Sequence, residues 1–277
     1  MKRLDLRAPS TYVPLLLLAL ALAAPAVLPP LVVPFGYSAA FVRDILVNVC
    51  IFALLGVSWN ILGGYAGQLS LGHAAYFGIG AYTSTLLLVK AGVPTVAGLF
   101  LGGLMAMLVS IFIGLASFRL RGPYFAIATI ATAETLRLLA LKFSGLTYGA
   151  MGTTIPFKGN DPIDLQFTDK VSYYYVGLAL LLVAIVGGVG TLWGPVIGAL
   201  LLTPLSSTIQ ASLGNSFPGA QLIVYALVMI AVILFRPSGL VGLLAPAYRR
   251  FLSALPGAGL DRRRVQKAEE ARRASPA

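Results

Sequence analysis

Long apolar stretches with almost no charge constrain the fold of this chain more than any other feature. A helix that crosses a bilayer needs ~20 mostly apolar residues at 1.5 Å each. Six stretches approach or exceed that length: Tyr12–Val33, Ile45–Leu62, Ala66–Val89, Val93–Phe118, Tyr124–Leu141 and Leu222–Phe235. Charged residues make up only 10% of the 277 residues, against ~25% in a typical soluble domain. Because so few charges could not cover a soluble fold, we expect an all-α, polytopic bundle of transmembrane helices in a lipid bilayer.

A seventh apolar stretch, Ser172–Leu202, has 31 residues and no charge, which is long for one span. Gly187, Gly188 and Gly190 interrupt it, and glycine is common in membrane spans where another backbone comes close. We therefore interpret this stretch as two short spans or one broken helix. Two spans would bring the expected total to about eight.

The distribution of Lys and Arg predicts which ends of the chain face the cytoplasm. Cytoplasmic segments of membrane proteins carry an excess of these residues. The N-terminus has Lys2, Arg3 and Arg7, and nine of the twenty Lys and Arg residues lie from Arg236 onward. Both ends should therefore be cytoplasmic, which requires an even number of spans. This basic tail explains the formal charge of +11 without nucleic acid as a partner.

Three parts follow from this pattern. We expect a cytoplasmic N-terminus over residues 1–11, a transmembrane domain over residues 12–243, and a basic cytoplasmic tail over residues 244–277 that is attracted to anionic lipid. The first span also imitates a signal peptide, because Val13–Leu22 is followed by the small residues Ala24-Pro25-Ala26. Its apolar run continues beyond that point, which favours a retained helix.

The sequence offers no chemistry for an enzyme. A P-loop ends in Gly-Lys-Ser/Thr, and no Gly-Lys pair occurs in this chain. There is one cysteine, Cys50, and one histidine, His73, so no Cys/His cluster can hold a metal and no disulfide framework exists. We expect no cofactor and no catalytic residue. If ATP drives this protein, another chain binds it.

The segment Gly63–Tyr82, GGYAGQLSLGHAAYFGIGAY, is too polar and too glycine-rich for a helix that faces lipid. On a helix, Ser70, His73, Phe77, Gly80 and Ser84 would form one stripe at i, i+3, i+4 spacing. Such a stripe should face the interior of the protein. For Gln68, Ser70 and His73, two interpretations stay open: tight packing with satisfied polar groups, or lining of a substrate pathway.

Three pairs of glycines at i, i+4 spacing are candidates for close helix packing. They are Gly63 with Gly67, Gly98 with Gly102, and Gly194 with Gly198. Small residues at this spacing let two helix backbones approach in lipid.

Glu134 and Arg137 are three residues apart, so they share a helix face and can pair. Glu134 is expected ~15 Å from the start of its helix, close to the middle of the bilayer. Charged groups at that depth are costly unless they are paired or hydrated, and they often have a function. The pair either fixes helix packing or lines the solute path, where it would offer both signs of charge to a zwitterion.

Gly63–Tyr82 closely resembles the signature segment of permeases from branched-chain amino acid ABC transporters. RGPYFAIATIATAETLRLLAL, GGVGTLWGPVIGALL and LFRPSGLVG are similar to further segments of that family, in the same order. This resemblance covers about Ile45–Tyr148 and Val186–Leu243. It implies an inner-membrane permease subunit that pairs with a second permease, two cytoplasmic ATP-binding subunits and an extracytoplasmic solute-binding protein. The resemblance implies leucine, isoleucine and valine as typical substrates, with short amides, urea and other amino acids as alternatives.

One departure from the family pattern concerns coupling. Permeases of this family carry a charged cytoplasmic loop in their C-terminal half, but Val171–Phe235 contains no Lys, Arg, Asp, Glu or His. We therefore expect this chain to lack an internal segment that includes the coupling loop and at least one nearby helix. The alternative is that the loop was never needed here and the partner permease does all the docking. Two alternatives to an ABC permease stay open: an ion-coupled secondary transporter, which would usually have more ionisable residues in its spans, and an internally deleted permease that does not couple.

Overall fold

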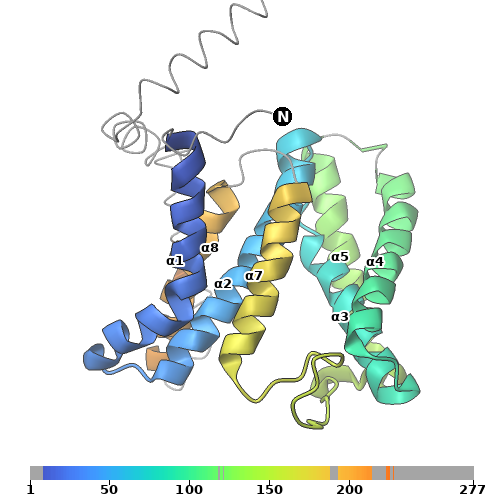
Figure 1. Ribbon diagram of the computed structural model, residues 1–277. Helices are drawn as coiled ribbons and strands as arrows, with labels where there is room; N and C mark the ends of the chain where they lie inside the picture. The colour runs from blue at the N-terminus through green and yellow to red at the C-terminus, as the bar shows by residue number, and fades with distance from the viewer. Residues whose placement is uncertain are drawn as a thin grey trace, which may run out of the picture. The chain divides into compact units, whose positions relative to one another are not determined.

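The computed structural model describes residues 9–117, 119–120, 122–187 and 193–213, together with 223–224 and 227. The described residues form helices joined by turns and loops (Figure 1), and their β pairing is limited to an isolated bridge between Asp161 and Gln166. The elements are α1 (Pro9–Val32), η1 (Val33–Phe35), α2 (Ala39–Asn60), η2 (Ile61–Tyr65), α3 (His73–Ala91), α4 (Thr95–Ser117), α5 (Pro123–Lys142), α6 (Ser144–Thr147), η3 (Gly149–Met151), α7 (Lys170–Gly187) and α8 (Trp193–Leu213).

The expected fold class is confirmed. Within the described part, four helical stretches are long and apolar enough to cross a membrane: Leu16–Phe35, Ala39–Gly64, Thr95–Leu115 and Pro123–Lys142. Lys170–Ala184 is a shorter apolar helix. The chain is therefore an all-α, multi-pass membrane protein. The predicted span Leu222–Phe235 lies almost wholly outside the described residues, so the total of eight stays a prediction.

Local sequence explains where the helices begin and end. α3 ends at Ala91 and is capped by Gly92, which has a φ of 65°. The amide N–H groups of Gly92 and Val93 donate to the carbonyls of Leu88 and Leu87. This is the glycine-dependent closure typical of a helix C-terminus. α5 begins at Pro123, where the missing N–H of proline costs nothing because the first turn has no acceptor for it.

The apolar stretch Ser172–Leu202 contains parts of two helices. α7 ends at Gly187 and α8 begins at Trp193, and residues 188–192 lie outside the described part. The two described helices fit both interpretations, two short spans or one broken helix, so the choice between them stays open.

By its contacts, the chain divides into two compact units: residues 1–43 with 205–277, and residues 44–204. In the first unit, α1 leads into the short helix η1, and Gly36 closes it with a φ of 91° and an N–H bond to the carbonyl of Val33. Ser38 then caps α2, because its Oγ accepts the amide N–H of Phe41 at 3.2 Å.

In the second unit, α3 packs closely against α4 (Figure 1). A Cβ added to Gly102 would lie 2.6 Å from the carbonyl oxygen of Gly80, and one added to Gly98 would lie 2.6 Å from Oγ of Ser84. The two helices can approach this closely because neither glycine has a side chain.

A second set of contacts in this unit joins α2, α7 and α8. Its core consists of buried small and branched residues: Ala53, Val57, Leu181 and Ala199. Two further glycines permit close approach here, since a Cβ on Gly56 would lie 2.7 Å from Cβ of Pro195, and one on Gly177 would lie 3.1 Å from Cβ of Cys50. Lys170 at the start of α7 forms an ion pair with Asp44 of α2.

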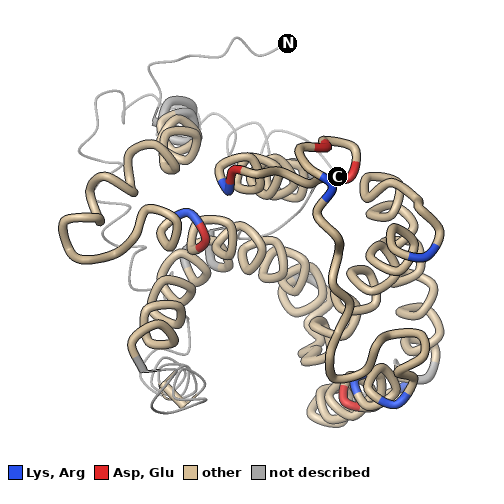
Figure 2. The backbone as a smooth tube through the Cα atoms, turned by 90° about the horizontal axis from the view of Figure 1, so that it is seen from below, with Lys and Arg blue, Asp and Glu red and all other residues tan. Residues whose placement is uncertain are grey.

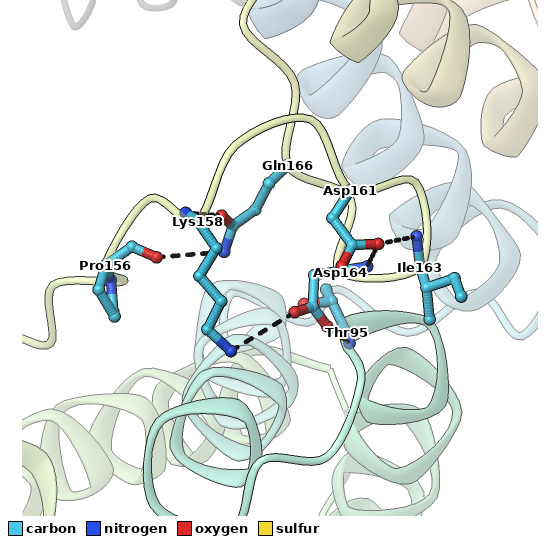
Figure 3. A network of polar contacts seen from close by, with 7 residues as sticks. All are labelled: Thr95, Pro156, Lys158, Asp161, Ile163, Asp164 and Gln166. Atoms are coloured by element: carbon cyan, nitrogen blue, oxygen red, sulfur yellow. Dashed lines mark hydrogen bonds and ion pairs between the residues drawn. The ribbon is translucent and has the colours of Figure 1, made fainter.

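The loop between α5 and α7 has a defined internal structure (Figure 3). The buried side chain of Gln166 accepts the amide N–H of Lys158 at 2.8 Å and donates to the carbonyl of Pro156 at 3.3 Å. Asp161 accepts the amide N–H of Ile163 at 2.9 Å. Asp164 accepts the amide N–H of Thr95 at 3.3 Å, so the loop satisfies a free donor at the N-terminus of α4.

The predicted start of the third span is wrong. We expected a helix over Ala66–Val89, but residues 66–72 are not helical and α3 begins only at His73. Glycine is the reason, because Gly67 has a φ of 64° and Gly72 approaches another backbone.

Candidate functional site

The break between α2 and α3 builds the candidate site. α2 ends at Asn60, the wider helical turn η2 covers Ile61–Tyr65, and a non-helical stretch follows over residues 66–72. A Cβ on Gly72 would lie 2.8 Å from the carbonyl oxygen of Thr129 on α5. Only glycine therefore lets this stretch lie against α5.

Neighbouring side chains bind the backbone of this non-helical stretch. Nε1–H of Trp59 donates to the carbonyl of Ser70 at 2.6 Å. The amide N–H of Leu71 donates to Oγ1 of Thr129 at 3.1 Å, and that of Gln68 donates to the carbonyl of Leu62 at 3.3 Å. Irregular backbone at membrane depth is tolerated only where it is buried in protein or lines a cavity. The three bonds satisfy part of the backbone of this stretch, and Ser70 and Gly72 within it are buried.

The non-helical stretch lies beside a cavity of about 420 Å³. The ends of α2 and α4 and the starts of α3 and α5 contribute its walls. Seven lining residues have polar side chains: Ser58, Ser70, His73, Tyr76, Ser110, Ser117 and Thr129. The others are apolar or glycine: Ile61, Leu62, Ala106, Met107, Ile113, Gly114 and Phe125. Among these described lining residues none is Lys, Arg, Asp or Glu, so hydroxyls and one imidazole supply its polarity.

The imidazole of His73 has unused hydrogen-bonding capacity. Within the described part, its Nδ1 is buried without a hydrogen-bond partner. Its ring meets the ring of Tyr76 edge to face, with centroids 6.2 Å apart. Buried polar atoms are usually satisfied by protein, water or ligand. A solute in the cavity could therefore bind this nitrogen.

The five predicted pathway residues fall in three places. Ser70, which is 1% exposed, and His73 line the cavity. Gln68 lies in the same non-helical stretch but outside the cavity lining, and its Oε1 is buried without a partner in the described part. Glu134 and Arg137 lie further along α5 and do not line the cavity.

Glu134 and Arg137 form the predicted pair. Arg137 binds both carboxylate oxygens of Glu134, through Nη2 at 2.6 Å and Nε at 2.9 Å. Both side chains are exposed. Two parallel charge-assisted bonds define the orientation of each partner.

The expected stripe on α3 is not one continuous helical face. Ser70 precedes the helix, His73 is its first residue, and Gly80 and Ser84 face α4. Phe77 is largely exposed. The stripe assumed a helix through residues 66–72, and those residues adopt another conformation.

The six glycines predicted for helix packing also differ in their surroundings. Gly98 and Gly102 face α3, as described above. Gly63 meets the ring of Trp59 on its own helix, and Gly67 provides the left-handed turn after η2. Gly198 has open space around it, and Gly194 lies in the first turn of α8.

Several lining residues were missed from the sequence. Ser58, Tyr76, Ser110, Ser117 and Thr129 are single polar residues within apolar spans. Oγ of Ser110 donates to the carbonyl of Met107 and Oγ1 of Thr129 donates to that of Ala126. Because such hydroxyls satisfy themselves on their own helix, they leave little trace in the hydropathy pattern. The recurrence of hydroxyls toward the end of α2, the end of α4 and the start of α5 was the available signal.

Comparisons with known proteins match part of this chain. Residues 41–169 match the sequence profile of the family described as branched-chain amino acid transport system, permease component. The chain is 37% identical over 119 residues to the high-affinity branched-chain amino acid transport system permease protein LivM of Escherichia coli (strain K12), and 36% identical over 119 residues to LivM of Salmonella typhimurium. Each match covers 43% of this chain and 28% of the relative.

No solved structure matches the chain. The chain matches little more than a quarter of the length of these curated relatives. The family profile nevertheless begins two residues into α2 and continues through α5 and the loop after it. The resemblance expected from the motifs is confirmed: over residues 41–169, this membrane protein is similar to the permease components of branched-chain amino acid transport systems.

Proposed function

We propose that this chain is the membrane-spanning permease subunit of an ABC importer, which carries branched-chain or similar amino acids and takes its energy from separate ATPase subunits. One observation carries the proposal. The region similar to branched-chain amino acid permeases, residues 41–169, contains every residue that lines the cavity. The family resemblance and the candidate site therefore coincide.

The lining of the cavity offers contacts for the aliphatic side chain and for the polar groups of an amino acid. Apolar walls from η2, α4 and α5 can accept a branched aliphatic side chain, because burial of apolar surface favours binding. Ser70, His73 and the neighbouring hydroxyls can exchange hydrogen bonds with a carboxylate or an ammonium group without a fixed charge. A neutral lining favours passage over tight binding, since a transported solute must leave as well as enter.

Gln68 extends the proposed pathway beyond the cavity lining, whereas the pair Glu134–Arg137 keeps two alternatives, lining of the path and packing against another helix. Gln68 is close in sequence to the cavity and has a free carbonyl oxygen in the described part. The pair presents both signs of charge on an exposed face of α5, which would suit either the two ends of a zwitterion or the polar groups of a neighbouring helix.

The proposed partners follow from the family. They are a second permease subunit, two cytoplasmic ATP-binding subunits and an extracytoplasmic solute-binding protein. In the proposed arrangement the chain lies in the inner membrane with both termini in the cytoplasm. The loop between α5 and α7 is then extracytoplasmic, and the cavity lies at the cytoplasmic end of its helices.

Coupling to the ATPase is a separate part of the proposal. Residues 171–235 have no charged side chain, and a coupling helix needs exposed polar residues to bind a soluble partner. We propose that this chain lacks the internal coupling segment and holds an ATPase weakly by itself. Stable, stoichiometric co-purification of this chain with the ATPase, without the second permease, would contradict this part.

The transport proposal is tested in proteoliposomes that contain this chain with its co-expressed permease and ATPase partners. We expect uptake of labelled leucine, with the binding protein added outside, to require ATP inside. Ionophores that collapse proton and sodium gradients should leave this uptake unchanged. Uptake that needs an ion gradient and no ATP would instead identify a secondary transporter.

A further inference from the structure

The exposed face of α5 carries charge at a depth where lipid offers no partner for it. Arg137 is 59% exposed and Glu134 is 53% exposed. Glu134 lies nearer the middle of its helix than any other charged residue in the described part of the chain. Along the described backbone, Lys, Arg, Asp and Glu are few compared with the other residues (Figure 2). For a 20-residue helix, the Cα of Glu134 lies about 16 Å from Pro123 along the axis, which is close to the bilayer centre.

The arginine does not escape toward the membrane surface. Helical side chains lean toward the N-terminus of their helix, and Arg137 follows that direction to bind both oxygens of Glu134, three residues earlier. A lipid-facing arginine would extend toward the nearer interface instead. Here the nearer end of α5 is Lys142, in the opposite direction.

The neighbouring helix α4 shows what a lipid-facing surface looks like in this chain. Its exposed residues are large and apolar, and they include Phe100, Leu108, Phe112 and Leu115. α5 differs, because Ala131 and Thr135 lie exposed beside Glu134 on its face. Oγ1 of Thr135 is satisfied by the carbonyl of Ala131 at 2.8 Å. Large apolar residues are exposed on α5 as well, among them Ile127, Ile130 and Leu138, so the charged pair is what distinguishes this face from that of α4.

The predicted last span of this chain is poorly suited to cover the pair. Leu222–Phe235 has no charged, amide or imidazole side chain, and its only hydroxyl is that of Tyr225. A helix that covers the pair would have to bring groups that can bind a carboxylate and a guanidinium at this depth.

We propose that the face of α5 marked by Ala131, Glu134, Thr135, Arg137 and Leu138 is the surface on which the second permease subunit packs. The partner helix would present hydrogen-bonding or charged side chains to the pair at mid-membrane depth. This inference rests on the proposed function, because that function requires a second permease.

The test uses the chain co-expressed with its partner permease and ATPase subunits in native membranes. A photo-reactive benzoylphenylalanine replaces Leu138 on the proposed interface, and in a second variant it replaces Phe112 on α4. Phe112 is the matched control, since it is 79% exposed on the apolar surface. After irradiation, we expect a covalent adduct with the second permease from position 138 at least fivefold above that from position 112.

Equal adduct formation at the two positions, or none at position 138, would overturn the proposal. An adduct of position 138 with a second copy of this chain would overturn the choice of partner. Glu134→Gln should lower the amount of co-purified second permease at unchanged levels of this chain, and unchanged co-purification would count against the interface.

Leucine uptake measured on the same membranes separates the two proposals. ATP-driven uptake without the adduct at position 138 would reject the interface alone. The adduct without ATP-driven uptake would leave the interface standing and reject the transport function.

Discussion

Gly102 shows how a single residue controls the approach of two membrane helices. Its missing side chain lets the backbone of α4 lie against the carbonyl of Gly80 on α3. In lipid no hydrophobic force drives helices together, so close packing of this kind supplies much of their association energy. The adjacent residue Gly103 points into open space. Of these two adjacent glycines in α4, Gly102 is therefore needed for packing against α3 and Gly103 is not.

Gly102→Ala should destabilise the protein by about 1–3 kcal/mol, because the added methyl group meets backbone rather than a movable side chain. Gly103→Ala should leave stability unchanged or raise it slightly, since alanine favours a helix and nothing obstructs its Cβ. Thermal unfolding of the two purified variants in the same detergent measures the difference. Equal midpoints for both variants would show that the α3–α4 contact does not depend on this glycine.

At the scale of elements, hydrogen bonds from side chains take the place of helical backbone bonds in two segments. Trp59 and Thr129 hold the non-helical stretch before α3. Gln166 holds the loop between α5 and α7, where its buried amide bridges the backbone of Lys158 and Pro156. The ion pair between Lys158 and Asp164 in that loop is longer, at 3.7 Å, and Lys158 is exposed. The side-chain amide of Gln166 should therefore contribute more to the stability of this loop than the ion pair between Lys158 and Asp164.

Gln166→Ala should make this loop about tenfold more sensitive to proteolysis. It leaves two backbone groups without a partner, at a cost of about 1–3 kcal/mol, and proteases cut segments that open locally. Lys158→Ala should change the rate less than about twofold, because exposed ion pairs contribute little. Cleavage by a non-specific protease added to the outer side of the membrane gives both rates. Equal sensitivity of the two variants would mean that the buried amide does not stabilise the loop.

Most helix positions could be predicted from the sequence, and the site only in part. Pro123–Lys142 and Thr95–Ser117 agree closely with the apolar stretches that predicted them. A run of apolar residues in a membrane has few conformations other than a helix, because its backbone groups must be satisfied internally. The start of α3 was missed, since glycines permit a helix as well as a turn. Only the contact of Gly72 with Thr129 decides between the two.

At the scale of the whole molecule, the arrangement across the membrane depends on the basic ends of the chain. Met151, in the loop between α5 and α7, is 96% exposed. A label at Met151 therefore tests which side of the membrane this loop faces better than a label at Asp164. The side chain of Asp164 is only 10% exposed and is bound to Lys158 and Thr95.

In a Cys50→Ser background, Met151→Cys should react with a membrane-impermeant thiol reagent in spheroplasts of living cells. Ser275→Cys, in the basic tail, should react only after permeabilisation, because both termini are expected in the cytoplasm. Mass-tagging of the two single-cysteine variants measures this. The reverse pattern would invert the proposed topology.

The cavity beside the break before α3 is the proposed solute path, and two nearby positions on α4 test that role. Ser110 lines this cavity, whereas Phe112, two residues along the same helix, lies on the exposed apolar surface of α4. The measurement is leucine uptake by the complete transporter after treatment with a small, membrane-permeant thiol reagent, in cysteine variants at these two positions and in the Cys50→Ser background. We predict that modification of Ser110→Cys blocks uptake, that excess leucine slows this block at least threefold, and that Phe112→Cys remains active. Undiminished uptake through a fully modified Ser110→Cys protein would contradict a solute path through this cavity.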